Sequence, residues 1–288
     1  MKCSLPAVWP AELHDPSGIR KASELETDNR NADRIARRGH TMVIDKGLGR
    51  NAFMDLIETA ADYIDCVKFG FGTSPLYNTD LLLYKIKLAK QHGIMVMPGG
   101  TLLEIAVQQD VVNAFFDTIG SFGFNGIEVS DGTIEISRKK RTELIQEGLK
   151  RGLRVVTEYG KKLSGSLIDA TNLAVTAEAD WDAGAELVTL EARESGVGVG
   201  IFDENGECRD EILDDVLRFV PDTKRLMWEA PLKHQQILLL RKFGSDVHLG
   251  NIPTYDTLAL ETLRRGLRSD TFEFGIREKQ ANANYYMI

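Results

Sequence analysis

Cysteine is scarce in this sequence, and the few cysteines present are not arranged for cross-linking or metal binding. The 288 residues include only Cys3, Cys66 and Cys208, and no two of them form a CxxC pair. This spacing indicates neither a disulfide framework nor a cysteine zinc site. The five histidines are equally scattered, which argues against zinc bound by histidine. We interpret Cys66, which lies within a predicted strand, as a small core residue.

Basic residues are in the minority, and long apolar runs are missing. The chain carries 35 Lys and Arg against 43 Asp and Glu, a formal net charge of −8, whereas nucleic acids and anionic membranes favour a basic surface. No stretch approaches the ~18 apolar residues of a membrane span, and the N-terminus lacks the apolar stretch of a signal peptide. We therefore expect no nucleic-acid partner, no membrane and a cytoplasmic location. Hydrophobic residues still make up 43% of the chain, enough for one large core.

Short apolar runs recur along the chain at intervals of roughly thirty residues, about the length of one strand–loop–helix–loop unit. Six of them end in a charged residue: Met42-Val-Ile-Asp45, Asp65-Cys-Val-Lys68, Gly126-Ile-Glu128, Val155-Val-Thr-Glu158, Leu187-Val-Thr-Leu-Glu191 and Leu226-Met-Trp-Glu229. Two lack the charge: Ile94-Met-Val-Met-Pro98 and Asp246-Val-His-Leu-Gly250. Eight such units predict a single (β/α)₈ TIM barrel of the α/β class, whose active site lies at the C-terminal ends of the strands.

The segments between these runs have the spacing of amphipathic helices. The helices are expected over Asn51–Tyr63, Thr79–His92, Thr101–Phe116, Ser137–Arg151, Asp169–Ala183, Glu211–Phe219, Lys233–Phe243 and Tyr255–Leu267. The connection after the sixth run is the longest, so it is a candidate lid or binding loop. We divide the chain into an N-terminal arm (1–40), a catalytic barrel domain (41–275) and a C-terminal tail (276–288). The alternative fold is a doubly wound open sheet, but no GxGxxG follows the first run and eight evenly spaced units favour closure.

The charged ends of the runs are predicted to meet inside the barrel. Side chains of a strand alternate between two faces, and the face opposite the charge is apolar, as with Ile127 and Val129 in the fourth run. The apolar face suits the layer between sheet and helices, so the charged face points into the mouth. The residues predicted there are Asp45, Lys68, Glu128, Glu158, Glu191 and Glu229.

Five carboxylates in one mouth need compensation, because like charges at close range raise one another's pKa. Protonation, cationic side chains or a bound cation could supply it. Mg²⁺ fits an oxygen-rich site, where it typically takes one or two carboxylates plus water and substrate oxygens. The alternative is a set of inward salt bridges that only fill space. Glu104, near a predicted helix start, is interpreted equally well as a charge favoured by the helix dipole and as a functional group.

Two loops and one arginine could hold an anionic substrate. Gly250-Asn251-Ile252 follows the eighth run, where barrels often bind phosphate. Arg193 can hold a carboxylate or a phosphate through two hydrogen bonds. The turn from Gly70 to Ser74 offers backbone N–H groups and two hydroxyls. Each of these signals is weak when taken alone.

Nine short stretches between about residue 40 and 275 form a further pattern: Thr41-Met-Val-Ile-Asp-Lys-Gly-Leu48, Val67-Lys-Phe-Gly-Phe-Gly-Thr-Ser74, Pro98-Gly-Gly-Thr-Leu102, Glu128-Val-Ser-Asp-Gly132, Thr157-Glu-Tyr-Gly-Lys-Lys162, Ala192-Arg-Glu-Ser-Gly196, Glu229-Ala-Pro231, Gly250-Asn-Ile252 and Glu261-Thr-Leu-Arg-Arg-Gly-Leu267. In these motifs and their order, the sequence resembles the phosphosulfolactate synthase family. The resemblance implies a (β/α)₈ barrel and a carbon–sulfur lyase of coenzyme M biosynthesis. It also implies the Mg²⁺-dependent addition of sulfite to phosphoenolpyruvate, giving (2R)-O-phospho-3-sulfolactate.

The resemblance also implies roles for individual residues. Lys162 matches the family's proposed general acid, and we expect neighbouring cations to lower its pKa into a range that suits proton transfer. Lys46 and Lys68 are the other catalytic candidates. The candidates for substrate binding are Arg193, Asn251, Gly250 and Ser74. The candidates for holding the metal are Glu128, Glu158, Glu191 and Glu229.

Two other functions stay open at this point. A related barrel could act on another phosphorylated three-carbon acid with a different nucleophile, or the chain could be a non-catalytic, stress-associated homologue. A chemically competent residue stands at every motif position, which favours an active enzyme. Because apolar barrel rims often associate, we also expect a homo-oligomer.

Overall fold

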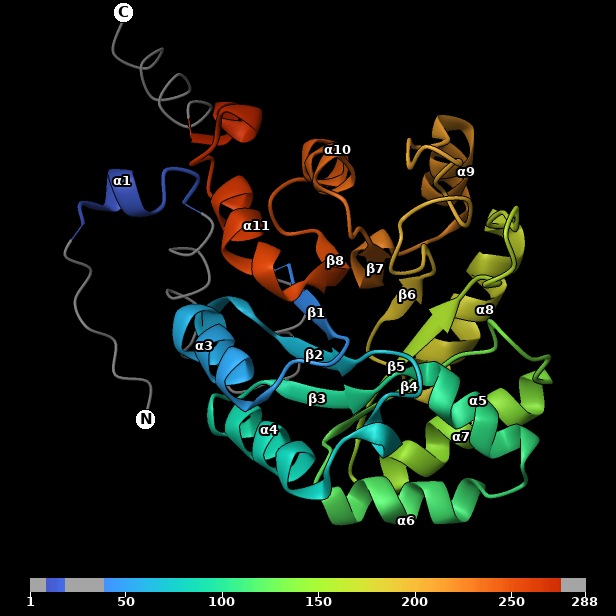
Figure 1. The fold of residues 1–288 in the computed structure, drawn as a ribbon. Helices are drawn as coiled ribbons and strands as arrows, with labels where there is room; N and C mark the ends of the chain where they lie inside the picture. The colour runs from blue at the N-terminus through green and yellow to red at the C-terminus, as the bar shows by residue number, and fades with distance from the viewer. Residues whose placement is uncertain (1–8, 19–38, 276–288) are drawn as a thin grey trace, which may run out of the picture.

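Eight parallel strands form one sheet in the computed structural model, which describes residues 9–18 and 39–275 (Figure 1). The strands lie in the order β3-β2-β1-β8-β7-β6-β5-β4, so the first strand pairs with the last. This closure confirms the predicted (β/α)₈ barrel and is incompatible with an open doubly wound sheet. The strands are β1 (Thr41–Asp45), β2 (Cys66–Phe69), β3 (Met95–Pro98), β4 (Gly126–Val129), β5 (Arg154–Tyr159), β6 (Val188–Leu190), β7 (Leu226–Glu229) and β8 (His248–Pro253).

The ladder of paired strands stops between β3 and β4, and Asn125 bridges this seam. Its side-chain carbonyl accepts a hydrogen bond from the Val96 amide at 2.7 Å, and its own amide donates to the Val96 carbonyl at 3.3 Å. The Asn125 carbonyl accepts from the Arg154 amide at 3.0 Å. One side chain thus supplies an acceptor that a regular ladder takes from the backbone, and the barrel is nearly closed.

Helices follow the strands and surround the barrel (Figure 1). They are α3 (Arg50–Ala60), α4 (Thr79–Gln91), α5 (Gly100–Gln108), α6 (Val112–Phe122), α7 (Arg138–Lys150), α8 (Ala170–Ala183), α9 (Asp210–Phe219), α10 (Lys233–Phe243) and α11 (Thr257–Arg264). Short 3₁₀ turns at Ser74–Leu76 and Thr254–Asp256 lie in the connections after β2 and β8. A short helix, α1 (Ala11–His14), lies beside α11.

The single helix predicted over 101–116 is wrong, because the chain breaks there into α5 and α6. The break is at Asp110, whose φ of 55° lies in the left-handed region. Aspartate tolerates this conformation better than most residues because its short polar side chain can hydrogen-bond locally. The apolar pattern continues across the break, so periodicity alone gives no sign of it.

Two apolar clusters build the interior, one on each side of the sheet. The larger lies between the strands and the helices. The smaller fills the inside of the barrel and consists of Met42, Cys66, Met95, Met97, Val156, Leu187 and Met227. Gly126 belongs to this arrangement, because a Cβ at that position would collide with the Met95 side chain. Cys66 is buried in this cluster, which confirms its prediction as a small core residue, and burial raises the pKa of its thiol to about 12.

Most of the predicted N-terminal arm and all of the C-terminal tail, 276–288, lie outside the described residues. Within the segments 9–18 and 39–275, no helix has the length and hydrophobicity needed to cross a membrane. The cytoplasmic location and the homo-oligomer stay predictions.

Candidate active site

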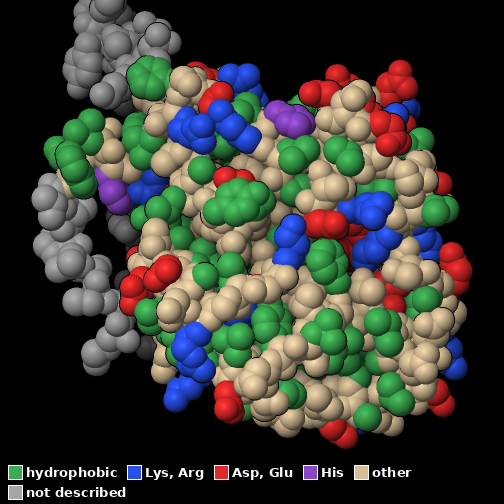
Figure 2. Space-filling model, viewed as in Figure 1, with side chains coloured by type: hydrophobic (Ala, Val, Ile, Leu, Met, Phe, Trp, Pro, Cys, Tyr) green, Lys and Arg blue, Asp and Glu red, His purple; other side chains and the backbone are tan. Residues whose placement is uncertain are grey.

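A layer of buried charges lies in the barrel mouth, directly above the methionine-rich cluster. In three strands, a charged residue stands two positions after a residue of that cluster: Lys68 after Cys66, Glu158 after Val156, and Glu229 after Met227. The period of two therefore turns both the apolar and the charged side chains inward. Every charged member of this layer is at most 4% exposed: Lys68, Glu128, Glu158, Glu191 and Glu229. On the face shown in Figure 2, acidic side chains gather beside basic ones near the centre.

Lys68 is the hub of this layer. Its ammonium lies 3.0 Å from a Glu229 oxygen, 3.2 Å from Glu128 Oε1 and 3.8 Å from Glu158 Oε2. Burial lowers the pKa of Lys68, but the surrounding carboxylates outweigh burial and raise it well above its ordinary value. Lys68 is therefore a permanent cation at neutral pH.

Lys162 enters the mouth from the loop after β5. Its ammonium lies 2.7 Å from Glu158 Oε1, 3.5 Å from Glu191 Oε2 and 3.6 Å from Glu104 Oε1. Burial lowers the pKa of Lys162, but Glu158 and Glu191 raise it above its ordinary value overall. The predicted lowering of this pKa is wrong, because the side chain lies among carboxylates rather than among cations.

Glu158 and Glu191 interact closely, and their surroundings shift the two pKa values in opposite directions. Burial acts to raise the pKa of Glu158, yet Lys162 and Lys68 lower it to about 2. Burial and the neighbouring carboxylates Glu158 and Glu229 raise the pKa of Glu191 well above its usual range. Burial also raises the pKa of Glu128, to about 6. The proton on Glu191 thus compensates part of the negative charge of the mouth.

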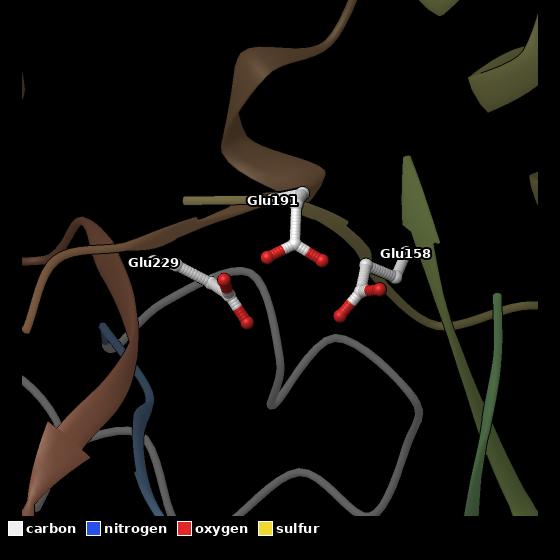
Figure 3. A group of neighbouring side chains, drawn as sticks. All are labelled: Glu158, Glu191 and Glu229. Atoms are coloured by element: carbon white, nitrogen blue, oxygen red, sulfur yellow. The ribbon is translucent and has the colours of Figure 1, made fainter. Parts of the chain in front are cut away.

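Three of these carboxylates converge in a way that fits a hard divalent cation (Figure 3). One oxygen each from Glu158, Glu191 and Glu229 lie within 4.8 Å of one another. Glu191 Oε2 is buried and, within segments 9–18 and 39–275, accepts no hydrogen bond, although the Lys162 ammonium lies 3.5 Å away; this oxygen therefore has capacity left for a further partner such as a cation. An all-oxygen donor set is the kind that Mg²⁺ prefers. Glu128 does not belong to this group of converging oxygens; its own oxygens accept from Gly100 N at 2.8 Å and from Lys68.

The predicted substrate-binding residues line the same end of the barrel. Ser74 Oγ and Asn251 Oδ1 are buried and have no hydrogen-bond partner in the part of the chain that the structure describes. Asn251 has a φ of 53° and Arg193 a φ of 61°, conformations that cost energy outside glycine. The Arg193 amide donates to Glu191 Oε1 at 2.6 Å, which directs that carboxylate. Gly250 is buried, whereas Lys46 and the Arg193 side chain are exposed.

Asp45 does not point into the mouth, contrary to the prediction. Its register partner on β2 is Phe69, a core residue on the helix side of the sheet, so Asp45 faces outward as well. There it accepts from Lys85 Nζ at 2.6 Å, Tyr77 Oη at 3.1 Å, and the amides of Gly47 and Leu48 at 2.9 and 2.8 Å. Asp45 therefore holds the turn that carries Lys46.

Glu104 belongs to the site as a buried support. Its Oε1 accepts from Ser130 Oγ at 2.7 Å and faces Lys162, while its Oε2 accepts from the amides of Thr133 and Ile134 at 2.7 and 2.9 Å. The carboxylate thus orders the loop after β4 and contacts the predicted general acid. The helix-dipole interpretation does not account for these bonds.

Lys85 and Arg141 are buried cations on helices that the sequence analysis missed. Lys85 is on the buried stripe of α4 with Leu82, Ile86 and Ala89. Arg141 is on the buried stripe of α7. A charged residue at an i, i+3, i+4 position among apolar ones is the signal that could have found them.

The long loop after β6 is anchored on two sides. Gly165 N donates to Gly198 O at 2.8 Å and Gly200 N to Ser166 O at 2.9 Å, which joins this loop to the loop that carries Lys162. The buried Gln235 amide donates to the carbonyls of Gly196 and Gly206 at 2.6 and 3.0 Å. The loop thus forms one wall of the mouth.

Comparison with known proteins decides the family. Residues 29–270 match the family model for (2R)-phospho-3-sulfolactate synthase (ComA). This chain belongs to that family. A phosphosulfolactate synthase of Methanothermobacter thermautotrophicus is 42% identical over 235 residues, covering 81% of this chain and 91% of the relative. A phosphosulfolactate synthase of Bacillus subtilis is 44% identical over 237 residues, covering 81% and 92%. The chain is therefore an enzyme of the phosphosulfolactate synthase type, a carbon–sulfur lyase.

Solved structures agree on the fold. The YdjI aldolase from Escherichia coli K12 aligns over 92% of this chain and 94% of its own, with a TM-score of 0.51 and 13% identity. At that identity the likeness extends to the fold alone.

Proposed function

We propose that this enzyme catalyses the Mg²⁺-dependent addition of sulfite to phosphoenolpyruvate, giving (2R)-O-phospho-3-sulfolactate. The observation that carries the proposal is the placement of the Lys162 ammonium, 2.7 Å from Glu158 and 3.5 Å from Glu191, beside three convergent carboxylates. Family membership supports the same product, since the relatives are named for phosphosulfolactate synthesis.

In the proposed reaction, the sulfur lone pair of sulfite attacks the methylene carbon of phosphoenolpyruvate. A C–S bond forms, and the electron pair of the C=C bond moves onto the adjacent carbon and its carboxylate. A proton then joins the carbon that bears the phosphate. The phosphate ester stays intact, and no oxidant or reductant is needed.

Lys162 is the proton donor in this scheme. The carboxylates around Lys162 keep it in the ammonium form at neutral pH, which is the form an acid must have, although its raised pKa makes it a weaker acid than the lowered pKa expected from the sequence would. Glu158 and Glu104 hold the ammonium from two sides and fix its direction. A donor on one side of a planar intermediate yields a single stereoisomer.

Glu158, Glu191 and Glu229 would hold the cation, since their oxygens converge. A bound Mg²⁺ would supply positive charge to the carboxylate on which negative charge develops. Lys68 adds a fixed charge beneath it, preorganised by three carboxylates. Ser74, Asn251, Lys46 and Arg193 are the residues proposed to bind the phosphate, the carboxylate and sulfite.

The test is product formation followed by NMR. Phosphoenolpyruvate labelled with ¹³C at the methylene carbon is mixed with sulfite, Mg²⁺ and enzyme in D₂O. The proposal predicts loss of the vinyl signal, a new CH₂–sulfonate signal, and one deuterium on the phosphate-bearing carbon. Chelation by EDTA should stop the reaction and added Mg²⁺ should restore it. A folded enzyme with Mg²⁺ that forms no C–S bond would overturn the proposal and favour another nucleophile.

A further inference from the structure

Arg141 lies outside the barrel mouth, yet it contacts three segments that build it. The side chain comes from α7 and is buried. Its Nε and Nη2 hold both oxygens of Asp180 on α8, at 2.7 to 3.1 Å. Nη2 also donates to the main-chain carbonyl of Glu158 at 3.0 Å, and Nη1 to Asp131 Oδ1 at 3.1 Å. One guanidinium therefore joins a helix, the end of β5 and the loop after β4.

The two loops that Arg141 joins are bonded to each other as well. Lys161 Nζ donates to the Asp131 carbonyl at 2.6 Å. Lys162 N donates to the Gly132 carbonyl at 3.1 Å. The same β4 loop supplies the amides of Thr133 and Ile134 that hold Glu104, which faces the Lys162 ammonium. A displacement at Asp131 would therefore reach Lys162 along bonded contacts.

We propose that Arg141 is a positioning residue, which sets the Glu158 carboxylate and the Lys162 ammonium from behind the barrel wall. The inference rests on the proposed function, because it assigns Arg141 to the placement of the proposed acid. Arginine suits the position since a planar guanidinium donates in several fixed directions at once. Lysine keeps the charge but cannot hold Asp180, Asp131 and the Glu158 carbonyl together.

Arg138 provides a matched control on the same helix. Its guanidinium pairs with the same Asp180, at 2.6 Å, and its side chain is 39% exposed. Unlike Arg141, it makes no contact with Asp131 or Glu158 among the hydrogen bonds and ion pairs of residues 39–275. If Arg141 served only to neutralise Asp180, substitution of Arg141 and substitution of Arg138 should have similar effects.

The experiment compares Arg141→Lys, Asp131→Ala and Arg138→Met by hydrogen–deuterium exchange and by steady-state kinetics. Asp131 is partly exposed, so its variant cuts the link from the loop side while the α7–α8 contact stays. For Arg141→Lys we expect faster amide exchange at 131–134 and 158–163. We also expect kcat to fall on the order of 10- to 100-fold, with a smaller change in KM, as for other residues that orient a site from behind. Asp131→Ala should change both readouts in the same direction, and Arg138→Met neither.

Unchanged exchange and kcat in Arg141→Lys would overturn the positioning role, as would equal effects in Arg138→Met. The exchange readout needs no substrate, so it tests the positioning role even if the wild-type enzyme forms no phosphosulfolactate. Failure of the proposed function would instead show in the wild-type NMR assay.

Discussion

Buried charges occur in two regions of this molecule, and the two regions differ in balance. On the helix side of the sheet, Asp45 has both oxygens satisfied by Lys85, Tyr77 and backbone amides. Inside the mouth, two lysines face five carboxylates, and no described residue donates a hydrogen bond to Glu191 Oε2, which lies 3.5 Å from the Lys162 ammonium. The carboxylates of both regions are at most 2% exposed, so burial of the carboxylates alone does not separate the regions. Balance does: the satisfied set holds loops, and the unbalanced set is prepared for a cation and an anionic substrate.

The two regions should also differ in how much a substitution lowers the free energy of unfolding. Removing one partner of a satisfied buried pair leaves an uncompensated charge and costs about 3–5 kcal/mol. Removing one carboxylate from an over-negative cluster relieves repulsion and is expected to cost little. Stability and activity should therefore respond in opposite ways in the two regions.

The largest expected effect is on catalysis, from Lys162→Met. Loss of the proposed proton donor should lower kcat by about 10²- to 10⁴-fold, the usual contribution of general acid catalysis. Steady-state kinetics with sulfite and phosphoenolpyruvate measures it. Lys139→Met, an 88% exposed lysine on α7, is the control and should leave kcat unchanged. A Lys162→Met enzyme with normal turnover would remove Lys162 from the mechanism.

The next effect is on stability, from Lys85→Met. This change leaves Asp45 buried with its closest cation gone, so the free energy of unfolding should fall by about 3–5 kcal/mol. Glu191→Gln, in the mouth, should leave that free energy unchanged or higher, while activity is lost. Urea unfolding of the metal-free proteins measures both. If Glu191→Gln destabilised the protein as much as Lys85→Met does, the distinction between the two regions would fail.

A smaller effect is the pH dependence of stability. The folded-state pKa of Glu128, about 6, lies above its ordinary value of 4.5, so the folded protein binds this proton more tightly. Its contribution is fully present below pH 4.5 and is lost as the pH rises through 6, a change of about 2 kcal/mol. Glu191 acts in the same direction, because its pKa is raised as well. The low pKa of Glu158 changes the stability only below about pH 4.5. The raised pKa values of Lys68 and Lys162 change it only above about pH 10.

His248 acts in the opposite direction in this pH range, because burial lowers its pKa to about 3. The contribution of Glu128 is therefore isolated by comparing the metal-free wild-type enzyme with Glu128→Gln, using urea unfolding at pH 5 and pH 8. Relative to Glu128→Gln, the wild-type enzyme should lose about 1 kcal/mol of stability between pH 5 and pH 8. A relative gain would contradict the sign of the Glu128 shift.

Much of the site follows from periodicity, and its failures have physical causes. The alternation of strand side chains places Lys68, Glu128, Glu158 and Glu229 in the mouth without further information. The prediction for Asp45 fails because its side chain lies on the outward face of β1. A charge at the end of an apolar run does not show to which face of the strand it belongs. The α5–α6 break fails because one left-handed residue interrupts an apolar pattern without altering it. The raised pKa of Lys162 depends on which charges surround it in space, and no spacing in the sequence encodes that.

The most direct test of the unbalanced mouth is the binding of Mn²⁺, a spectroscopic substitute for Mg²⁺, followed by electron paramagnetic resonance of the unbound ion. The wild-type enzyme should bind one Mn²⁺ per chain, and Glu191→Gln should lose that site. Glu186→Gln is the control. Glu186 pairs with Arg154 at the N-terminal ends of β5 and β6, which are the ends away from the mouth. It should bind Mn²⁺ as the wild-type enzyme does. Mn²⁺ binding that survives Glu191→Gln unchanged, or no binding by the folded wild-type enzyme, would contradict the account.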